Sequence, residues 1–170
     1  MSALAERAEK DLPSCEARVS HLTAVLRECL PGAESARVLV IAGSGLGGFA
    51  RAVHALASIP YAELPYVGAS TVAGHSGSLI YGSIGPQDGP GGTPILLMNG
   101  RRHLYEGITP ADSTLLLRAL LVAWPGLRSV IISNAAGGLN RTFEIADLML
   151  ISDHVNWMHR NPLIGRNVEA

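Results

Sequence analysis

The clearest periodic pattern of apolar and polar positions covers residues 11–30. Apolar side chains recur there every three or four positions, as they do on one face of a helix: Val19, Leu22, Leu26 and Cys29. Pro13 stands near the start of the pattern, and Pro31-Gly32 ends it. The segment is predicted to form an amphipathic helix.

A second helix is predicted from Pro110, in the stretch PADSTLLLRALLVAW. Thr109 is the expected N-cap because its hydroxyl can accept a hydrogen bond from a free N–H of the first turn. Pro110 suits the first helical position, and Asp112 places a negative charge in the first turn. Pro125-Gly126 is expected to end this helix.

Several short apolar runs have the length and the β-branched content of strands. They cover residues 37–42, 79–85, 94–99, 129–133 and 148–152. The glycine- and proline-rich residues 86–93 are predicted to form a turn. Continuous apolar runs are typical of strands buried on both faces, so residues 1–170 are predicted to form a single α/β domain with a largely parallel sheet.

Ligands of such sheets bind at the carboxyl ends of the strands, which here are followed by glycine-rich or polar segments. Gly43, Gly45 and Gly48 fit the pattern G-x-G-x-x-G, whose backbone N–H groups can face an anion. A dinucleotide site also needs an acidic residue about 20 positions on, at the end of a second strand. Glu63 has that spacing, but its surroundings, IPYAELP, are a poor strand. The loop predicts anion binding, with a plain glycine turn as the alternative.

The segment NGRRHLYEG, residues 99–107, carries several functional side chains after an apolar run. In an extended segment Arg101, His103 and Tyr105 share one face because side chains alternate. Arginine can bind phosphate through two hydrogen bonds, histidine can share a proton with it, and tyrosine can donate to a sugar hydroxyl. A solvated loop is the alternative interpretation.

Two further loops complete the candidate site. SNAAGGLN, residues 133–140, has small residues where a ligand could approach the backbone closely, although a tight packing turn has the same composition. In AGHSG, residues 73–77, His75 stands between glycines and is expected to be exposed. His21, His54 and His159 are expected to lie on the surface. If the strands are parallel, the loops converge on one site for phosphate and a sugar.

Composition narrows the class of partner. The chain has 170 residues, 48% of them hydrophobic, and 13 Lys plus Arg against 14 Asp plus Glu, a formal net charge of -1. This balance gives no basic surface for nucleic acid and favours a small-molecule partner. Cys15 and Cys29 would lie about 21 Å apart on one helix and are not expected to pair. No zinc-type spacing and no long apolar segment occur, so we expect a cytoplasmic protein without a metal or a membrane span.

Five motifs, in this order, resemble the trimeric class of purine nucleoside phosphorylases: GSGLGGFA, AGHSG, NGRRHLYEG, SNAAGGLN and DLMLISDHVNWMHRNPLIGRN. The resemblance extends over nearly all of the chain. The related 5'-methylthioadenosine phosphorylases share the architecture, but the forms HLYEG and NAAGGLN are more similar to the purine nucleoside branch.

The resemblance implies phosphorolysis, in which a purine nucleoside and inorganic phosphate, the co-substrate, give a free base and ribose 1-phosphate without any other cofactor. It implies a phosphate site whose members are Ser44, Arg101, His103 and the N–H of Ala135, with His75 beside it. His75 and His103 would be the catalytic residues. Tyr105 would contact the ribose, Asn134 would shape the turn that presents Ala135, and Glu106 would orient His103.

Two departures from the family pattern are visible. Arg102 stands where the family usually has an aromatic residue, and family members run well past Ala170, into the part that recognises the purine. We therefore expect an N-terminal portion with a mixed, largely parallel sheet flanked by helices and truncated at its C-terminal side. This portion would be poorly stable alone, and the complete chain would form a homotrimer. Methylthioadenosine phosphorylase activity, a dinucleotide-binding domain and an inactive fragment that binds phosphate or a partner subunit are the alternatives.

Overall fold

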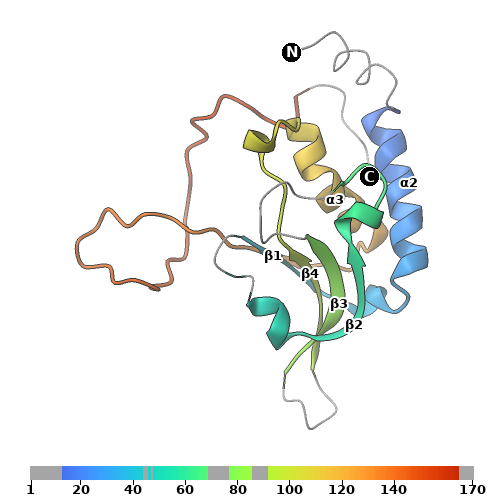
Figure 1. The fold of residues 1–170 in the computed structure, drawn as a ribbon, viewed down its shortest axis with the longest axis horizontal. Helices are drawn as coiled ribbons and strands as arrows, with labels where there is room; N and C mark the ends of the chain where they lie inside the picture. The colour runs from blue at the N-terminus through green and yellow to red at the C-terminus, as the bar shows by residue number, and fades with distance from the viewer. Residues whose placement is uncertain (1–12, 44–45, 47, 69–76, 86–91, 165–170) are drawn as a thin grey trace.

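The computed structural model describes residues 13–43, 46, 48–68, 77–85 and 92–164. A five-stranded mixed sheet forms the centre, and two long helices pack against one of its faces (Figure 1). The predicted α/β class is therefore confirmed.

The two helices are those that the periodic segments predict. Helix α2 spans Cys15–Cys29, and Ser14 caps it by accepting a hydrogen bond from the N–H of Ala17. It begins later than residue 11 because this cap fixes its first turn. Helix α3 spans Pro110–Ala123, with the predicted Thr109 cap accepting from the N–H of Asp112. Within the described residues, no helix is long and apolar enough to cross a membrane.

The strands lie in the order β2-β3-β4-β1-β5. Their bounds are β1 Val38–Ala42, β2 His54–Pro60, β3 Ser78–Ile84, β4 Thr93–Asn99 and β5 Ser129–Ile132. Strand β1 pairs in parallel with β4 and β5, whereas β3 pairs antiparallel with β2 and β4. Four of the predicted runs thus form strands at nearly the predicted bounds, in a mixed sheet with two parallel and two antiparallel pairs.

Strand β2 was not predicted from the sequence. It forms an edge of the sheet, most of its residues are exposed, and its pairing with β3 shifts register between Ala55 and Ala57. Such a strand lacks the continuous apolar run of a buried strand. Glu63 lies in the short 3₁₀ helix η3, Tyr61–Glu63, and not at the end of a strand beside β1. The arrangement required for a dinucleotide site is therefore not present at Glu63.

The predicted strand at 148–152 is wrong. This part of the chain belongs to a long segment that follows β5 and loops away from the sheet (orange to red in Figure 1). Leu148 is 98% exposed and Leu150 is 96% exposed. An apolar run becomes a strand only where a neighbour satisfies its backbone hydrogen bonds, and no described strand pairs with these residues.

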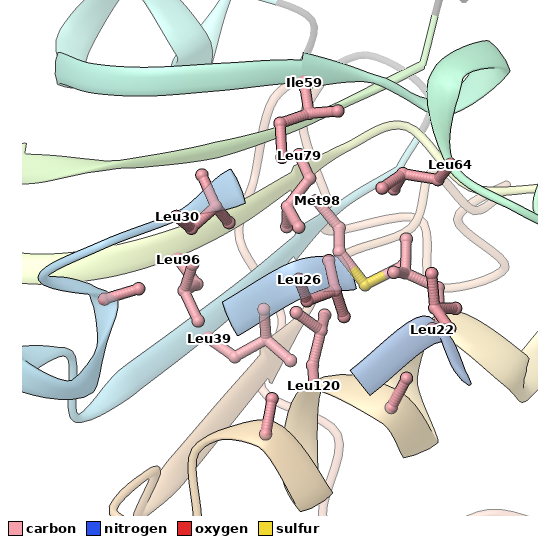
Figure 2. Close-up of a cluster of buried hydrophobic side chains, with 14 of the residues drawn as sticks. Leu22, Leu26, Leu30, Leu39, Ile59, Leu64, Leu79, Leu96, Met98 and Leu120 are labelled. Carbon is pink, nitrogen blue, oxygen red and sulfur yellow. The ribbon is translucent and has the colours of Figure 1, made fainter. Parts of the chain in front are cut away.

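The main core fills the space between the sheet and the two helices (Figure 2). Leu22 and Leu26 of α2 meet Leu120 of α3 over Leu39 and Leu96 of the sheet, and all five are buried. Full burial of a leucine side chain contributes about 1.5–3 kcal/mol. A smaller cluster on the opposite face joins sheet residues to the 3₁₀ helix η2, Phe49–Ala52. The sheet is thus a fixed support for the loops at its ends.

Candidate active site

Described residues of four of the motifs, Gly43, Gly77, Asn99 and Ser133, lie at the same end of the sheet. Because β4, β1 and β5 are adjacent and parallel, their carboxyl ends lie together, with Ala42 opposite Asn99 and Ile41 opposite Ile132. Strand β3 runs the other way and begins at the same edge, with Ser78 opposite Asn99. The predicted convergence of the loops is therefore confirmed for the described residues.

The glycine loop begins in close contact with the segment that follows β5. The N–H of Gly43 donates to Ser133 Oγ at 2.9 Å. A Cβ atom at position 43 would lie only 2.2 Å from the carbonyl oxygen of Ser133. Gly43 is therefore required by this close backbone approach.

Asn134 and Ala135 follow directly and are exposed. Asn134 Nδ2 donates to the carbonyl oxygen of Ala135 at 3.3 Å, so the amide touches the turn that it was predicted to shape. Among the described residues, the Ala135 N–H makes no hydrogen bond. It is therefore a candidate donor to an anion.

Arg101 follows the turn at Gly100, whose φ of 99° is a conformation that favours glycine. The Nε atom of Arg101 is buried and has no hydrogen-bond partner among the described residues, as is also true of Arg18 and Arg102. A buried donor of this kind is costly unless an acceptor reaches it. An anionic ligand would supply that acceptor.

His103 is held by Glu106. The carboxylate Oε1 accepts from the His103 backbone N–H at 2.7 Å and lies 3.2 Å from the ring Nδ1. The side chain of Glu106 is 1% exposed and that of His103 is 21% exposed. The contact fixes the imidazole at the rim of the site, as an orienting role for Glu106 requires.

Tyr105 lies against His103, but not for the predicted reason. The segment is not extended throughout, because Leu104–Glu106 form the 3₁₀ helix η4. The two rings nevertheless stack, with centroids 4.7 Å apart and an interplanar angle of 11°. Tyr105 is 74% exposed and is therefore open to a ligand.

Tyr61 also lies at this end of the sheet, and the sequence analysis did not identify it. Its hydroxyl donates to the carbonyl oxygen of Gly100 at 2.8 Å, and its backbone N–H donates to the carbonyl oxygen of Gly77 at 3.0 Å. The side chain is buried, and this burial raises the pKa of its hydroxyl, which therefore remains a donor. Its position between two prolines gives no sequence signal of this role.

Arg102 points into the protein rather than to solvent. Its Nη1 donates to the carbonyl oxygen of Val67 at 2.6 Å, and its guanidinium lies beside Gly68. Arg102, which departs from the family pattern, therefore makes a hydrogen bond that joins the segment after β4 to the loop that ends at residue 68.

The remaining site predictions concern Ser44 and His75, which lie outside the described residues. His21, His54 and His159 are exposed, as predicted. Cys15 and Cys29 are free, at opposite ends of α2. No group of three or more His, Cys, Asp or Glu side chains that could hold a metal ion occurs in the described ranges.

Comparison with known proteins identifies the family. Residues 37–170 match the Phosphorylase superfamily. This chain belongs to that superfamily. The match includes the glycine loop, the segment after β4 and the segment after β5, which together form the edge described above.

Relatives within the superfamily are named as purine nucleoside phosphorylases. The chain is 41% identical over 145 residues to purine nucleoside phosphorylase 1 of Geobacillus stearothermophilus, covering 85% of this chain and 49% of that protein. It is 40% identical over 143 residues to purine nucleoside phosphorylase of Saccharomyces cerevisiae, covering 80% and 44% respectively. The chain spans about half the length of the curated relatives it matches.

Solved structures of the superfamily agree with the fold. The purine nucleoside phosphorylase of Schistosoma mansoni in complex with a monocyclic inhibitor has a TM-score of 0.73 and 30% identity, over 89% of this chain and 53% of that chain. The structure of the same enzyme with inosine has a TM-score of 0.72 and 30% identity, covering 89% and 50% respectively. The mixed sheet flanked by helices is thus the fold of this superfamily.

Proposed function

We propose that this chain provides the phosphate- and ribose-binding part of a purine nucleoside phosphorylase, with a purine nucleoside and inorganic phosphate as substrates. The observation that carries the proposal is the convergence of the segments that hold Gly43, Arg101 and Ala135, which follow three adjacent parallel strands at the same end of the sheet. The similarity to proteins named purine nucleoside phosphorylase supports the choice of reaction.

The phosphate would be bound mainly by N–H donors. Arg101 would contribute its guanidinium, Ala135 its free backbone N–H, and His103 the ring nitrogen not directed toward Glu106. Arginine suits this role because its planar fork matches the geometry of phosphate oxygens. Ser44 and His75 would complete the site, as the motif resemblance implies.

Cleavage of a glycosidic bond passes through a sugar with oxocarbenium character, which carries positive charge. A phosphate anion fixed beneath the sugar stabilises this charge and is already placed to attack the anomeric carbon. Tyr105, exposed and stacked on His103, would contact the ribose beside the phosphate. In this reaction phosphate is the nucleophile, and the chain's own residues orient it.

A second candidate is a phosphate-binding portion that is catalytically inactive without further polypeptide. It is favoured by the exposed apolar residues of β5 and of the segment after it, such as Ile132 at 58% and Leu150 at 96%. These side chains are typical of a surface that another polypeptide segment covers. We propose further that a chain of the full length of these relatives would assemble as a homotrimer.

The test combines a binding and an activity measurement on the 170-residue chain. Phosphate binding is measured by calorimetry, and phosphate-dependent release of hypoxanthine from inosine by absorbance, each with Arg101→Ala as the comparison. Methylthioadenosine in place of inosine separates the two phosphorylase activities. Binding and activity that both need Arg101 support the enzyme, whereas binding without activity supports the second candidate. Lack of phosphate binding contradicts both.

A further inference from the structure

The main chain of Gly100–His103 carries two of the proposed phosphate ligands but lies beyond the sheet. Strand β4 ends at Asn99, so no strand pairing fixes the residues that follow. Gly100 adds a turn with φ of 99°. The orientation of Arg101 and His103 therefore depends on contacts from outside the sheet.

Tyr61 makes the first of these contacts. Its hydroxyl donates to the Gly100 carbonyl at 2.8 Å from a side chain that is only 1% exposed, so water does not compete for the bond. The Tyr61 ring has little freedom to move, because it lies so close to Gly77 that a Cβ atom there would be 2.5 Å from the ring. The backbone N–H of Tyr61 also donates to the Gly77 carbonyl. Tyr61 thus fixes the turn at Gly100 relative to the start of β3.

Arg102 makes the second contact, from within the segment. Its Nη1 donates to the Val67 carbonyl at 2.6 Å, and a Cβ atom at Gly68 would lie 3.5 Å from the same Nη1. Neighbouring side chains point to opposite sides of an extended backbone, which is the conformation found at His103. Holding Arg102 to the Val67 carbonyl would therefore restrict the backbone from which its two sequence neighbours, Arg101 and His103, project.

We propose that Tyr61 and Arg102 are positioning residues for phosphate binding, which hold Gly100–His103 so that Arg101 and His103 face the same anion. This inference rests on the proposed function, because it concerns the phosphate site named there. Neither residue contacts phosphate itself. Tyr61 acts through the Gly100 carbonyl, and Arg102 acts through the Val67 carbonyl.

The test of Tyr61 uses Tyr61→Phe, which removes the hydroxyl and keeps the ring. Tyr81→Phe is the matched control, because the Tyr81 hydroxyl is also hydrogen-bonded, to Ser35 Oγ at 2.9 Å, and its side chain is also buried. Inorganic phosphate is titrated into each 170-residue chain at constant ionic strength. Tyr61→Phe is expected to weaken phosphate binding about three- to tenfold, the equivalent of one hydrogen bond. Both substitutions remove one buried hydrogen bond, so we expect them to lower thermal stability to a similar extent. Tyr81→Phe is expected to leave phosphate affinity unchanged.

The test of Arg102 uses Arg102→Gln, with Arg27→Gln as its control. Arg27 also donates to backbone carbonyls, those of Val122 and Ala123, and its loss changes the net charge equally. Arg102→Gln is expected to weaken phosphate binding about as much as Tyr61→Phe does. The ratio of the phosphate affinities of variant and parent chain should stay the same from about 0.1 M to about 1 M potassium chloride. A contribution from charge alone would shrink over that range, because the screening length falls to about 3 Å.

The outcomes separate this inference from the proposed function. If the parent chain does not bind phosphate, the proposed function is overturned and the inference falls with it. If the parent binds phosphate and both Tyr61→Phe and Arg102→Gln bind it equally well, only the inference is overturned. A loss for Arg102→Gln that disappears at high salt overturns the positioning role of Arg102 and leaves that of Tyr61.

Discussion

The backbone N–H of Gly43 donates a hydrogen bond to Ser133 Oγ at 2.9 Å, although the two residues are 90 positions apart in the chain. Ser133 also donates its own N–H to the carbonyl oxygen of Ile41 at 3.0 Å, which continues the pairing between β1 and β5 beyond the last strand residue. The first residue of the glycine loop is therefore fixed to the start of the segment that carries Asn134 and Ala135.

The absence of a side chain at Gly43 is expected to be essential for this contact. In Gly43→Ala the new methyl group would meet the Ser133 carbonyl oxygen at 2.2 Å, so the two backbones would have to separate. We expect the free energy of unfolding to fall by about 1–3 kcal/mol, the usual cost of overpacking. Chemical denaturation measures the change.

Gly137→Ala is the control for that substitution. A Cβ atom at Gly137 has nothing within 4 Å among the described residues, so this change should alter stability by less than about 0.5 kcal/mol. Equal effects of the two substitutions would contradict the close approach at Gly43.

Glu106 is expected to support both the local fold and the orientation of His103. Its carboxylate accepts from the His103 N–H and lies beside the ring, an arrangement that closes a capping box on the 3₁₀ helix. Glu106→Ala should cost about 1 kcal/mol of stability, the typical value of a lost cap, and should weaken phosphate binding. Calorimetric titration with phosphate and chemical denaturation provide the two readouts.

Glu106→Gln keeps an oxygen that can accept from the His103 N–H and should recover most of the lost stability. If the alanine and glutamine variants are equally unstable, the hydrogen bond does not contribute as the geometry indicates. If neither variant changes phosphate affinity, the orientation of His103 by Glu106 is not needed for binding.

The elements predicted correctly are those whose signals are local. The cap at Thr109, the periodic pattern of α2 and the apolar runs of β1 and β4 depend on residues close together in the sequence. Strand β2 could not be predicted in this way, because its sequence, HALASIP, has no continuous run of large apolar residues. Strand β5 is also an exposed edge strand, but its run of Val130, Ile131 and Ile132 gives the signal that β2 lacks. The error at 148–152 is of the opposite kind, because the pattern of a strand is present there and a partner among the described strands is not.

The site shows the same division between local and distant information. The glycine loop, the segment at 101–106 and the segment at 134–135 are visible as motifs, and the parallel pairing of β4, β1 and β5 brings them together. The residues that fix these motifs from elsewhere have no motif of their own. Tyr61 is 39 positions from Gly100 in the sequence, and Arg102 is 35 positions from Val67. These residues come into contact only in the folded chain, so a local pattern cannot reveal them.

Acid should weaken the ion pair between Arg18 of α2 and Asp112 of α3. Burial raises the pKa of Asp112, but hydrogen bonds from Thr109 and Arg18 and the charge of Arg18 outweigh it, so the pKa lies below its ordinary value of 3.8. The folded state then releases this proton more readily than the unfolded chain. The resulting stabilisation is complete above the ordinary pKa and is lost as the pH falls through the lower, folded value.

Asp112→Asn is expected to remove that part of the pH dependence. Stability measured by urea denaturation should fall less steeply below about pH 4 in this variant than in the parent chain. Arg18→Gln, which removes the partner of Asp112, should reduce the slope in the same way. An unchanged slope in Asp112→Asn would show that the Arg18–Asp112 pair does not contribute to acid sensitivity.

The free edge of β5 is expected to make the isolated 170-residue chain associate with itself. Val130, Ile131 and Ile132 are 41%, 55% and 58% exposed, and within the described residues β5 has a neighbouring strand on one side only. An apolar strand with unpaired backbone groups is a template for pairing with another chain. A lysine on such an edge opposes that pairing, so Ile131→Lys should shift the chain toward monomer in light scattering coupled to size exclusion. Leu121 is 41% exposed but belongs to helix α3, whose backbone hydrogen bonds are made within the helix, so Leu121→Lys should leave strand pairing and association unchanged. A parent chain that is monodisperse and unfolds in one sharp transition would contradict this expectation.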